Sequence, residues 1–167
     1  VKYTLPERTT GVTLAGNINS TESDDVTTTL NFYDSLGSLY QATVVLHKEG
    51  QTGNDVTYSI TASSITKDGE KTDLTLTTSN TLVFNSFTGL SNEANANIEF
   101  TVESPTANDP QLDNIGAEGT HILTVDMSGI KMLADKSSIK QTYGIKDATT
   151  GNYIGGGKAV GCNNWFD

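Results

Sequence analysis

Few residues in this 167-residue chain have the types and spacing that metal binding or catalysis requires. Its imidazole and thiol groups amount to two histidines, His47 and His121, and one cysteine, Cys162. Zinc sites take three or four ligands, and the sequence has no HExxH, CxxC or HxH motif and no GxSxG nucleophile elbow. We therefore expect both histidines to be surface residues at strand ends, and we expect no catalytic residue, metal or cofactor.

Three weaker signals favour ordinary structure over ligand binding. Gly155-Gly156-Gly157-Lys158 is rich in glycine, but it lacks the GxxxxGK[ST] spacing of a phosphate-binding loop. Asp24-Asp25 and Asp68-x-Glu70 are acidic, but neither matches the DxDxDG pattern of a calcium loop. These segments are interpreted as a flexible terminal stretch and solvated acidic turns.

The composition narrows the class of protein. The net charge is −10, with a pI near 4.4, and such a surface repels nucleic-acid phosphates. No apolar run reaches 18 residues, so we expect no membrane partner. Charged residues make up 18% and hydrophobic residues 35% of the chain, and threonine fills much of the remainder. Threonine suits half-exposed strands, and a single cysteine excludes an internal disulfide.

Alternating apolar and polar residues predict an all-β fold. The expected strands are 11–16, 26–33, 39–47, 55–63, 73–78, 81–87, 96–103 and 120–127. About seven strands with short turns and no βαβ alternation favour an antiparallel β-barrel or β-sandwich. We expect at most a short helical turn near residues 129–136, and a surface loop over residues 105–119.

The most informative stretch is TLNFYDSLGSLYQATVVLHKE, residues 29–49. Two alternating strands flank the turn Asp34-Ser35-Leu36-Gly37, which predicts a hairpin. The carboxylate of Asp34 can cap the turn, and Gly37 can adopt the positive φ that closes it. Asp34 and Gly37 are therefore the predicted structural turn residues.

Several short sequence motifs occur in the same order as in one known family, which they resemble. They are Gly16-Asn17-Ile18-Asn19-Ser20 within residues 5–20, Tyr33-Asp34-Ser35-Leu36-Gly37, Leu82-Val83-Phe84-Asn85, and ILTVDMSGIKMLA at residues 122–134. In these motifs the chain resembles the outer domain of bacterial flagellar hook proteins. The motifs cover about a third of the residues. The match departs after Gln141-Thr142-Tyr143-Gly144, where the ending GGGKAVGCNNWFD is unlike the family.

The resemblance implies a structural protein of the extracellular bacterial flagellum rather than an enzyme. Its partners would be copies of itself in a curved helical tube that acts as a universal joint through exchangeable contacts. The isolated domain would be monomeric. Residues 1–167 would form one outer β-domain, in which residues 1–20 and 140–167 are extended segments that lead to and from an absent inner domain.

Two further hypotheses accompany this interpretation. Some spirochete hook proteins that resemble the family cross-link neighbouring subunits through a lysine and a cysteine followed by asparagine, and Lys158, Cys162 and Asn163 offer those residue types. The alternative function is an extracellular carbohydrate-binding or adhesin β-module, which Thr-rich strands and acidic loops favour. Tyr33, Tyr40 and Tyr58 could form its platform, although their strand positions favour packing across the sheet.

Overall fold

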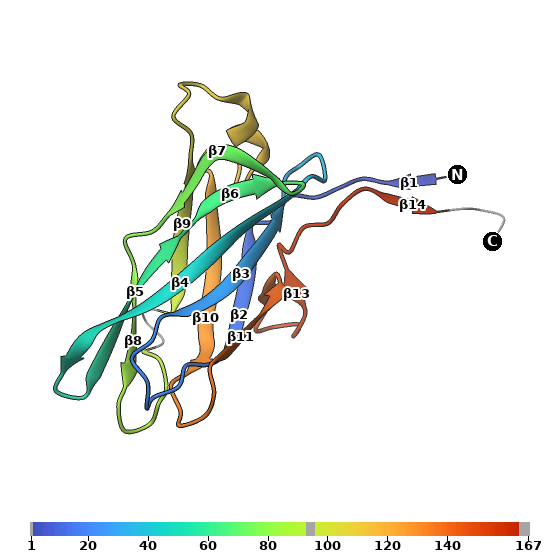
Figure 1. Ribbon diagram of the computed structural model, residues 1–167. Helices are drawn as coiled ribbons and strands as arrows, with labels where there is room; N and C mark the ends of the chain where they lie inside the picture. Colours follow the sequence, from blue (N-terminus) through green and yellow to red (C-terminus); the bar gives the residue numbers. More distant parts are fainter. Residues whose placement is uncertain (1, 93–95, 164–167) are drawn as a thin grey trace.

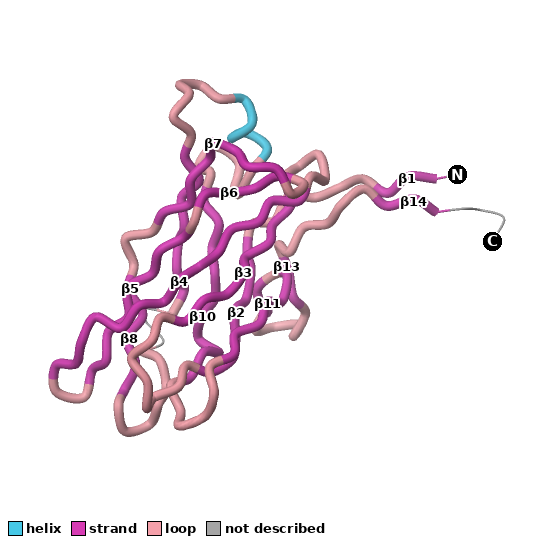
Figure 2. The backbone as a smooth tube through the Cα atoms, viewed as in Figure 1, coloured by secondary structure: helices cyan, strands magenta, loops and turns pink. Residues whose placement is uncertain are grey.

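The computed structural model describes residues 2–92 and 96–163, and it is all-β, as the sequence predicts (Figures 1 and 2). The strands of the main sheet are β2 (Gly11–Asn17), β3 (Val26–Tyr33), β4 (Leu39–Thr52), β5 (Asp55–Ala62), β6 (Ser64–Lys67), β7 (Glu70–Thr77), β8 (Thr81–Asn85), β9 (Asn97–Glu103), β10 (Ile122–Lys131) and β11 (Ser138–Tyr143). The remaining elements are β1 (Lys2–Thr4), β12 (Ile145–Lys146), β13 (Tyr153–Ile154), β14 (Gly161–Asn163) and the 3₁₀ helix η2 (Pro110–Asn114). Among the described residues, no helix is long and apolar enough to cross a membrane.

The main sheet is mixed and open. Its ten strands follow the order β11-β2-β10-β9-β7-β6-β4-β5-β8, with β3 paired to β4 beside this path. All of its strand pairs are antiparallel except β2–β10, which is parallel. The expectation of an antiparallel barrel or sandwich of about seven strands is therefore not confirmed in strand number or direction, because the sheet has ten strands and one parallel pair. Because β11 returns antiparallel to β2, Tyr143 lies opposite Val12, and the chain enters and leaves the sheet at one end.

The strand β11 and the short strand β6 are elements that the sequence pattern did not reveal. The predicted helical turn near residues 129–136 does not form, because β10 continues to Lys131 and its backbone has partners. The Lys131 carbonyl accepts a hydrogen bond from the Ile18 N–H at 2.7 Å, and the Met132 N–H donates to the Gly89 carbonyl at 2.7 Å. These partners hold the segment extended.

The helical turn occurs instead inside the predicted surface loop 105–119, as η2. Asp109 caps η2 by accepting a hydrogen bond from the Gln111 N–H at 3.0 Å, and Pro110 begins it. The loop is partly interior, because Ile115 is fully buried at its end. Because the loop is acidic, its composition did not indicate that Ile115 would be buried.

The apolar residues of the alternating strands form one core. It contains Val12, Leu14, Leu30, Phe32, Tyr40, Val44, Leu46, Tyr58, Ile65, Leu74, Leu76, Phe84, Ile98, Phe100, Leu123, Val125, Met127 and Ile130, among others. Phe32 stacks on Tyr40 with ring centroids 5.4 Å apart, and Tyr58 meets Phe84 edge to face at 5.5 Å. Burial of one such side chain contributes roughly 1.5–3 kcal/mol. The period-two pattern thus accounts for most of the interior.

Eight strands form a ring, β3-β4-β6-β7-β9-β10-β2-β11, in which β3 and β11 meet without backbone pairing. The Gln141 side chain bridges this seam: its Oε1 accepts from the Asn31 N–H at 2.7 Å, and its Nε2 donates to the Asn31 carbonyl at 2.8 Å. Tyr33 and Tyr143 stack beside it at 5.5 Å. The Gln141 amide therefore satisfies both backbone groups of Asn31 at an edge that would otherwise be open to another strand. The Thr28 hydroxyl donates to the Ile139 carbonyl at 3.3 Å across the same seam.

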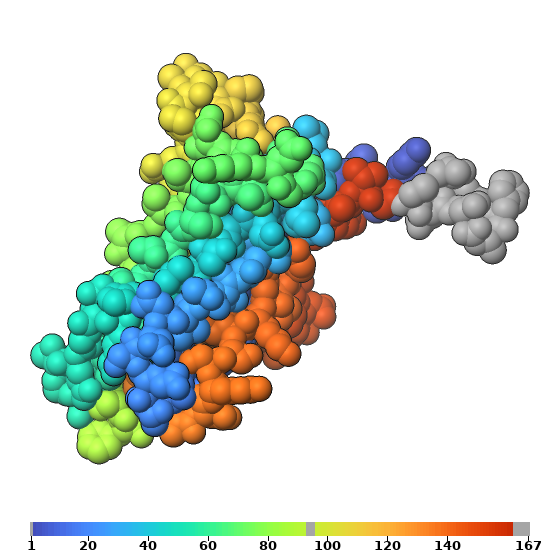
Figure 3. Space-filling view, viewed as in Figure 1, coloured from blue at the N-terminus to red at the C-terminus, as the bar shows by residue number. Residues whose placement is uncertain are grey.

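The two ends of the described chain leave the sheet together (Figures 1 and 3). β1 pairs antiparallel with β14 in a two-stranded ladder beside the sheet, with Tyr3 opposite Cys162. β12 and β13 form a separate hairpin, and the Thr13 hydroxyl of β2 donates to the Gly144 carbonyl at 2.8 Å where that hairpin begins.

Candidate functional site

Several long-range hydrogen bonds meet where the paired terminal segments join the sheet. We call the contact between residues 34–37, 5–10 and 155–160 the junction. Its first component is the turn that joins β3 to β4. The Asp34 side chain is buried, and its Oδ1 accepts hydrogen bonds from the backbone N–H groups of Leu36 and Ser38, both at 2.9 Å. The Gly37 N–H donates to the Asp34 carbonyl at 3.1 Å, so one residue fixes the turn from both sides.

The turn is also bound to η2 through the core. The Tyr40 hydroxyl donates to Asp34 Oδ2 at 2.8 Å and accepts from Gln111 Nε2 at 2.9 Å. Burial raises the pKa of Tyr40 well above its ordinary value, and the neighbouring Asp34 carboxylate adds to the increase, while the Gln111 hydrogen bond opposes it. Ser35 completes the connection, because its N–H donates to the Asn114 carbonyl at 2.8 Å. The turn and the 105–119 loop therefore form one rigid end of the domain.

Gly37 is the point at which the turn touches both terminal segments. Its φ is +87°, which an L side chain rarely adopts. A Cβ atom here would lie 2.9 Å from the Val160 nitrogen and 3.0 Å from the Pro6 Cβ. The glycine is therefore required by backbone conformation and by the close approach of two segments that are far apart in sequence.

Hydrogen bonds join the two terminal segments to each other and to β3. Glu7 and Lys158 exchange backbone hydrogen bonds at 3.0 and 2.9 Å, and the Lys158 Nζ lies 3.9 Å from Glu7 Oε1. Thr9 is fully buried. Its hydroxyl accepts from the Tyr33 N–H at 2.9 Å and donates to the Gly156 carbonyl at 2.8 Å. One threonine thus ties β3 to both terminal segments.

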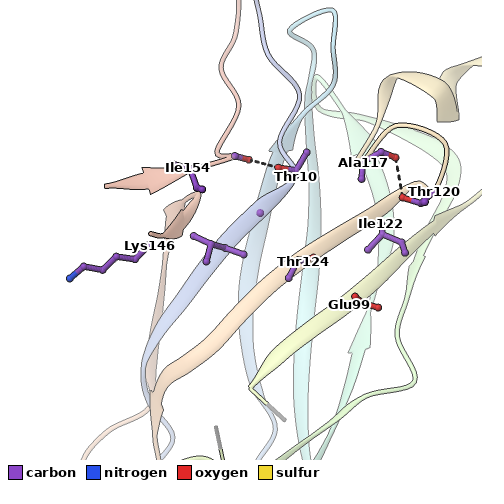
Figure 4. Close-up of a pocket in the computed structure, with 11 residues that line it drawn as sticks. Thr10, Glu99, Ala117, Thr120, Ile122, Thr124, Lys146 and Ile154 are labelled. Atoms are coloured by element: carbon purple, nitrogen blue, oxygen red, sulfur yellow. Dashed lines mark hydrogen bonds between the residues drawn. The ribbon is translucent and has the colours of Figure 1, made fainter. Parts of the chain in front are cut away.

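A groove of about 670 Å³ opens beside the junction, over the starts of β2 and β10 (Figure 4). Its lining includes Thr10, Glu99, Ala117, Ile122, Thr124, Ile145, Lys146 and Ile154. Ile145 packs where a Gly11 side chain would be, because a Cβ at Gly11 would lie 2.7 Å from the Ile145 Cδ1. The lining residues supply one carboxylate and one amine but no imidazole or thiol, which is a recess suited to packing rather than to catalysis.

The histidines lie apart from the junction and from each other. His47 lies within β4 rather than at a strand end, because β4 continues to Thr52. Its Nδ1 is 2.6 Å from Asp25 Oδ1, and the hydrogen bond to this carboxylate raises the pKa of His47. The His121 Nε2 is 3.7 Å from Asp113 Oδ1. No group of three or more His, Cys, Asp or Glu residues within 2–92 and 96–163 could hold a metal ion.

The structure places the predicted site residues in two regions. Asp34 and Gly37 lie in the turn between β3 and β4, and their control of the hairpin register stays a prediction. Lys158 lies in the junction opposite Glu7, and Cys162 and Asn163 belong to β14, where their side chains lie outside the described part of the structure. The cross-link hypothesis therefore stays a prediction.

Sequence reasoning missed Thr9, Gln111 and Gln141, which carry the long-range polar contacts. Each bonds to a partner between 24 and 147 residues away, so no local pattern marks it. Tyr40 and Tyr58 are buried in the core, and Tyr33 packs on Tyr143. Packing in the core is therefore confirmed for Tyr40 and Tyr58.

Comparison with known proteins finds one family. The model of the flagellar basal body protein FlaE D2 domain matches residues 4–144. This range includes every strand of the ten-stranded sheet. No curated protein matches the chain.

Proposed function

Because the chain belongs to the family of the flagellar basal body protein FlaE D2 domain, a structural domain of the flagellar hook, we propose that it forms part of the outer surface of a curved hook tube. The family match to residues 4–144 is the observation that carries this proposal, since it spans the entire sheet. In this role the domain transmits force as a rigid body while its contacts with neighbouring copies change. The hook then acts as a universal joint between two rotating structures.

The junction supports the proposed mechanical role. A domain on the outside of a tube needs a firm connection to the part of the subunit nearer the axis. We propose that residues 1–20 and 140–167 contain this connection to an inner domain, with the β1–β14 ladder as its first part. Within those ranges β2 and β11 belong to the sheet, so segments 2–10 and 144–163 are the connecting parts. Thr9, Gly37 and the Glu7–Lys158 pair would transmit force between the sheet and the ladder.

The polar outer faces of β3, β4 and β5 support exchangeable contacts. Their outward residues include Thr29, Asn31, Gln41, Thr43, Ser59 and Thr61. No strand from β2 to β10 carries an exposed large hydrophobic side chain within the described residues. Hydroxyl and amide surfaces make wet contacts of modest strength. Neighbouring copies could therefore slide past one another at low cost.

Immunogold labelling of intact cells that express the chain tests this function. An antibody against the domain is expected to label a short extracellular structure between the cell surface and the flagellar filament. Labelling of the cell wall or of secreted material, with unlabelled hooks, would overturn the proposal and favour the adhesin alternative.

Several expectations from the sequence remain predictions under this proposal. They are the absence of enzymatic activity, of cofactors, and of nucleic-acid and membrane partners, as well as the monomeric state of the isolated domain. Sedimentation of the chain at micromolar concentration checks the last of these, and a single species with the mass of 17.7 kDa is expected.

A further inference from the structure

Charge is distributed unevenly along this acidic chain. Residues 68–126 contain ten of the twenty acidic residues and one lysine, whereas residues 131–158 contain five of the ten basic residues and two aspartates. The first stretch forms β7 to β9, the 105–119 loop and part of β10, and the second forms β11, β12 and their flanking segments. The acidic and the basic residues are therefore concentrated in different strands and loops, despite the overall negative charge.

The basic flank consists of Lys131, Lys136 and Lys140. All three side chains are exposed, and none of them forms an ion pair with another described residue. Lys140 lies opposite Ala15 of β2, which in turn lies beside Gly129 of β10. Lys140 therefore has a small side chain beside it on β2 and no side chain beyond that on β10.

The acidic flank consists of Asp73, Glu103 and Glu118. Asp73 and Glu103 are outward residues of β7 and β9, and Glu118 is an exposed residue of the neighbouring loop. Glu99 of β9 is not part of this flank, because it lines the groove together with Lys146. Glu103 lies opposite Thr75, two residues from Asp73, so their carboxylates lie on the same face of the β7–β9 pair. No ion pair within the described residues neutralises them.

The two flanks lie on different sides of the ring of strands. Asp73 on β7 and Lys140 on β11 are separated by β9, β10 and β2, and Figure 1 shows β7 and β9 on one side of the domain and β13, which follows β11, on the other. A contact that used the same flank on both copies would bring like charges together. A contact related by translation would instead place the basic flank of one copy against the acidic flank of the next.

We propose that the basic flank of one copy docks on the acidic flank of a neighbouring copy in a head-to-tail contact. This inference rests on the proposed function, because it requires copies arranged side by side in a polymer. Heterologous contacts of this kind propagate instead of closing. Complementary charges fix orientation and reject the reversed arrangement while contributing little net affinity, and such pairs can exchange partners as the tube bends.

Mutual rescue between charge-reversed variants tests the contact. One variant carries Lys136→Glu and Lys140→Glu, and the other carries Asp73→Lys and Glu103→Lys. Sedimentation equilibrium at millimolar protein measures the association of the copies. The buffer contains about 0.1 M salt, because the resulting screening length of roughly 10 Å suppresses long-range repulsion between these negatively charged molecules. Each variant alone is expected to associate roughly tenfold more weakly than the wild type, and their mixture is expected to recover the wild-type association.

The matched control is Lys48→Glu with Gln51→Glu and Thr61→Asp on β4 and β5, which changes the net charge by the same −4 as the first variant but leaves both flanks intact. It is expected to associate like the wild type. Equal losses in the control and in the flank variants, or a mixture that does not recover, would overturn the inference. Immunogold labelling of hooks separates the two proposals: labelled hooks without rescue refute only this contact, whereas unlabelled hooks refute the proposed function.

Discussion

Replacing Gly37 with valine tests the idea that the junction joins the sheet to the paired terminal segments. Gly37 has a φ of +87°, and Gly69, in the turn between β6 and β7, has a nearly identical φ of +84°. A Cβ at Gly37 would meet Val160 and Pro6, whereas a Cβ at Gly69 would meet nothing within 4 Å. Gly69→Val is therefore a matched control that carries the backbone penalty without the contact.

The magnitudes follow from these two differences. The left-handed conformation costs an L residue roughly 1–2 kcal/mol, and both variants carry this penalty. Forcing a side chain into an occupied space costs roughly 1–3 kcal/mol more, which only Gly37→Val incurs. We expect the free energy of unfolding to fall by about 3 kcal/mol for Gly37→Val and by about 1–2 kcal/mol for Gly69→Val.

Urea denaturation of both variants measures the difference, provided that the dependence on urea concentration keeps the wild-type slope. Hydrogen exchange at the Glu7 and Lys158 amides adds a local readout, because these groups hydrogen-bond each other's carbonyls across the junction. Exchange there is expected to accelerate in Gly37→Val and not in Gly69→Val. Equal losses of stability with unchanged exchange would refute the close approach of Val160 and Pro6 to the turn.

Three more predictions concern polar groups. Asp34→Ala should lower the free energy of unfolding by about 3 kcal/mol in urea, because two backbone N–H groups and a buried hydroxyl lose a carboxylate acceptor; a change below about 1 kcal/mol would contradict the network. Gln141→Ala should open the seam and accelerate hydrogen exchange at Asn31, with a loss of about 1–2 kcal/mol, and unaltered exchange would argue against the bridge. Asp25→Asn should lower the pKa of His47 in an NMR titration. Because the pKa of His47 is raised in the folded state, its pair with Asp25 contributes its full stabilisation below a pH of about 6.5, the unfolded value. This contribution is lost as pH rises through the folded pKa of His47. An unshifted titration of His47 in Asp25→Asn would contradict the pair.

The alternating pattern predicted the elements whose residues face one common core. β3, for example, begins and ends where the sequence indicates, since Leu30 and Phe32 must be buried while Thr29 and Asn31 need not be. β11 escaped detection because its inward positions hold Ile139 and Gln141, and a glutamine does not mark a buried face. Its role as a bridge depends on Asn31, which is 110 residues away.

The strand order and the junction could not be predicted, because both depend on distant pairings. Nothing in Gly11–Asn17 indicates a parallel partner, and the β2–β10 pair joins an early strand to a late one, with Thr124 opposite Gly11. Gly37 could be identified as a turn residue, yet its contact with Val160 required the folded chain. The sequence phrases shared with hook proteins pointed to the family without revealing either feature.

Cryo-electron microscopy of isolated hooks tests the central claim most directly. The account predicts that the ten-stranded sheet fits density on the outer surface of the tube, with the β1–β14 ladder directed toward the tube axis. Density in which this domain is absent from the hook, or in which the ladder points outward and away from the axis, would contradict it.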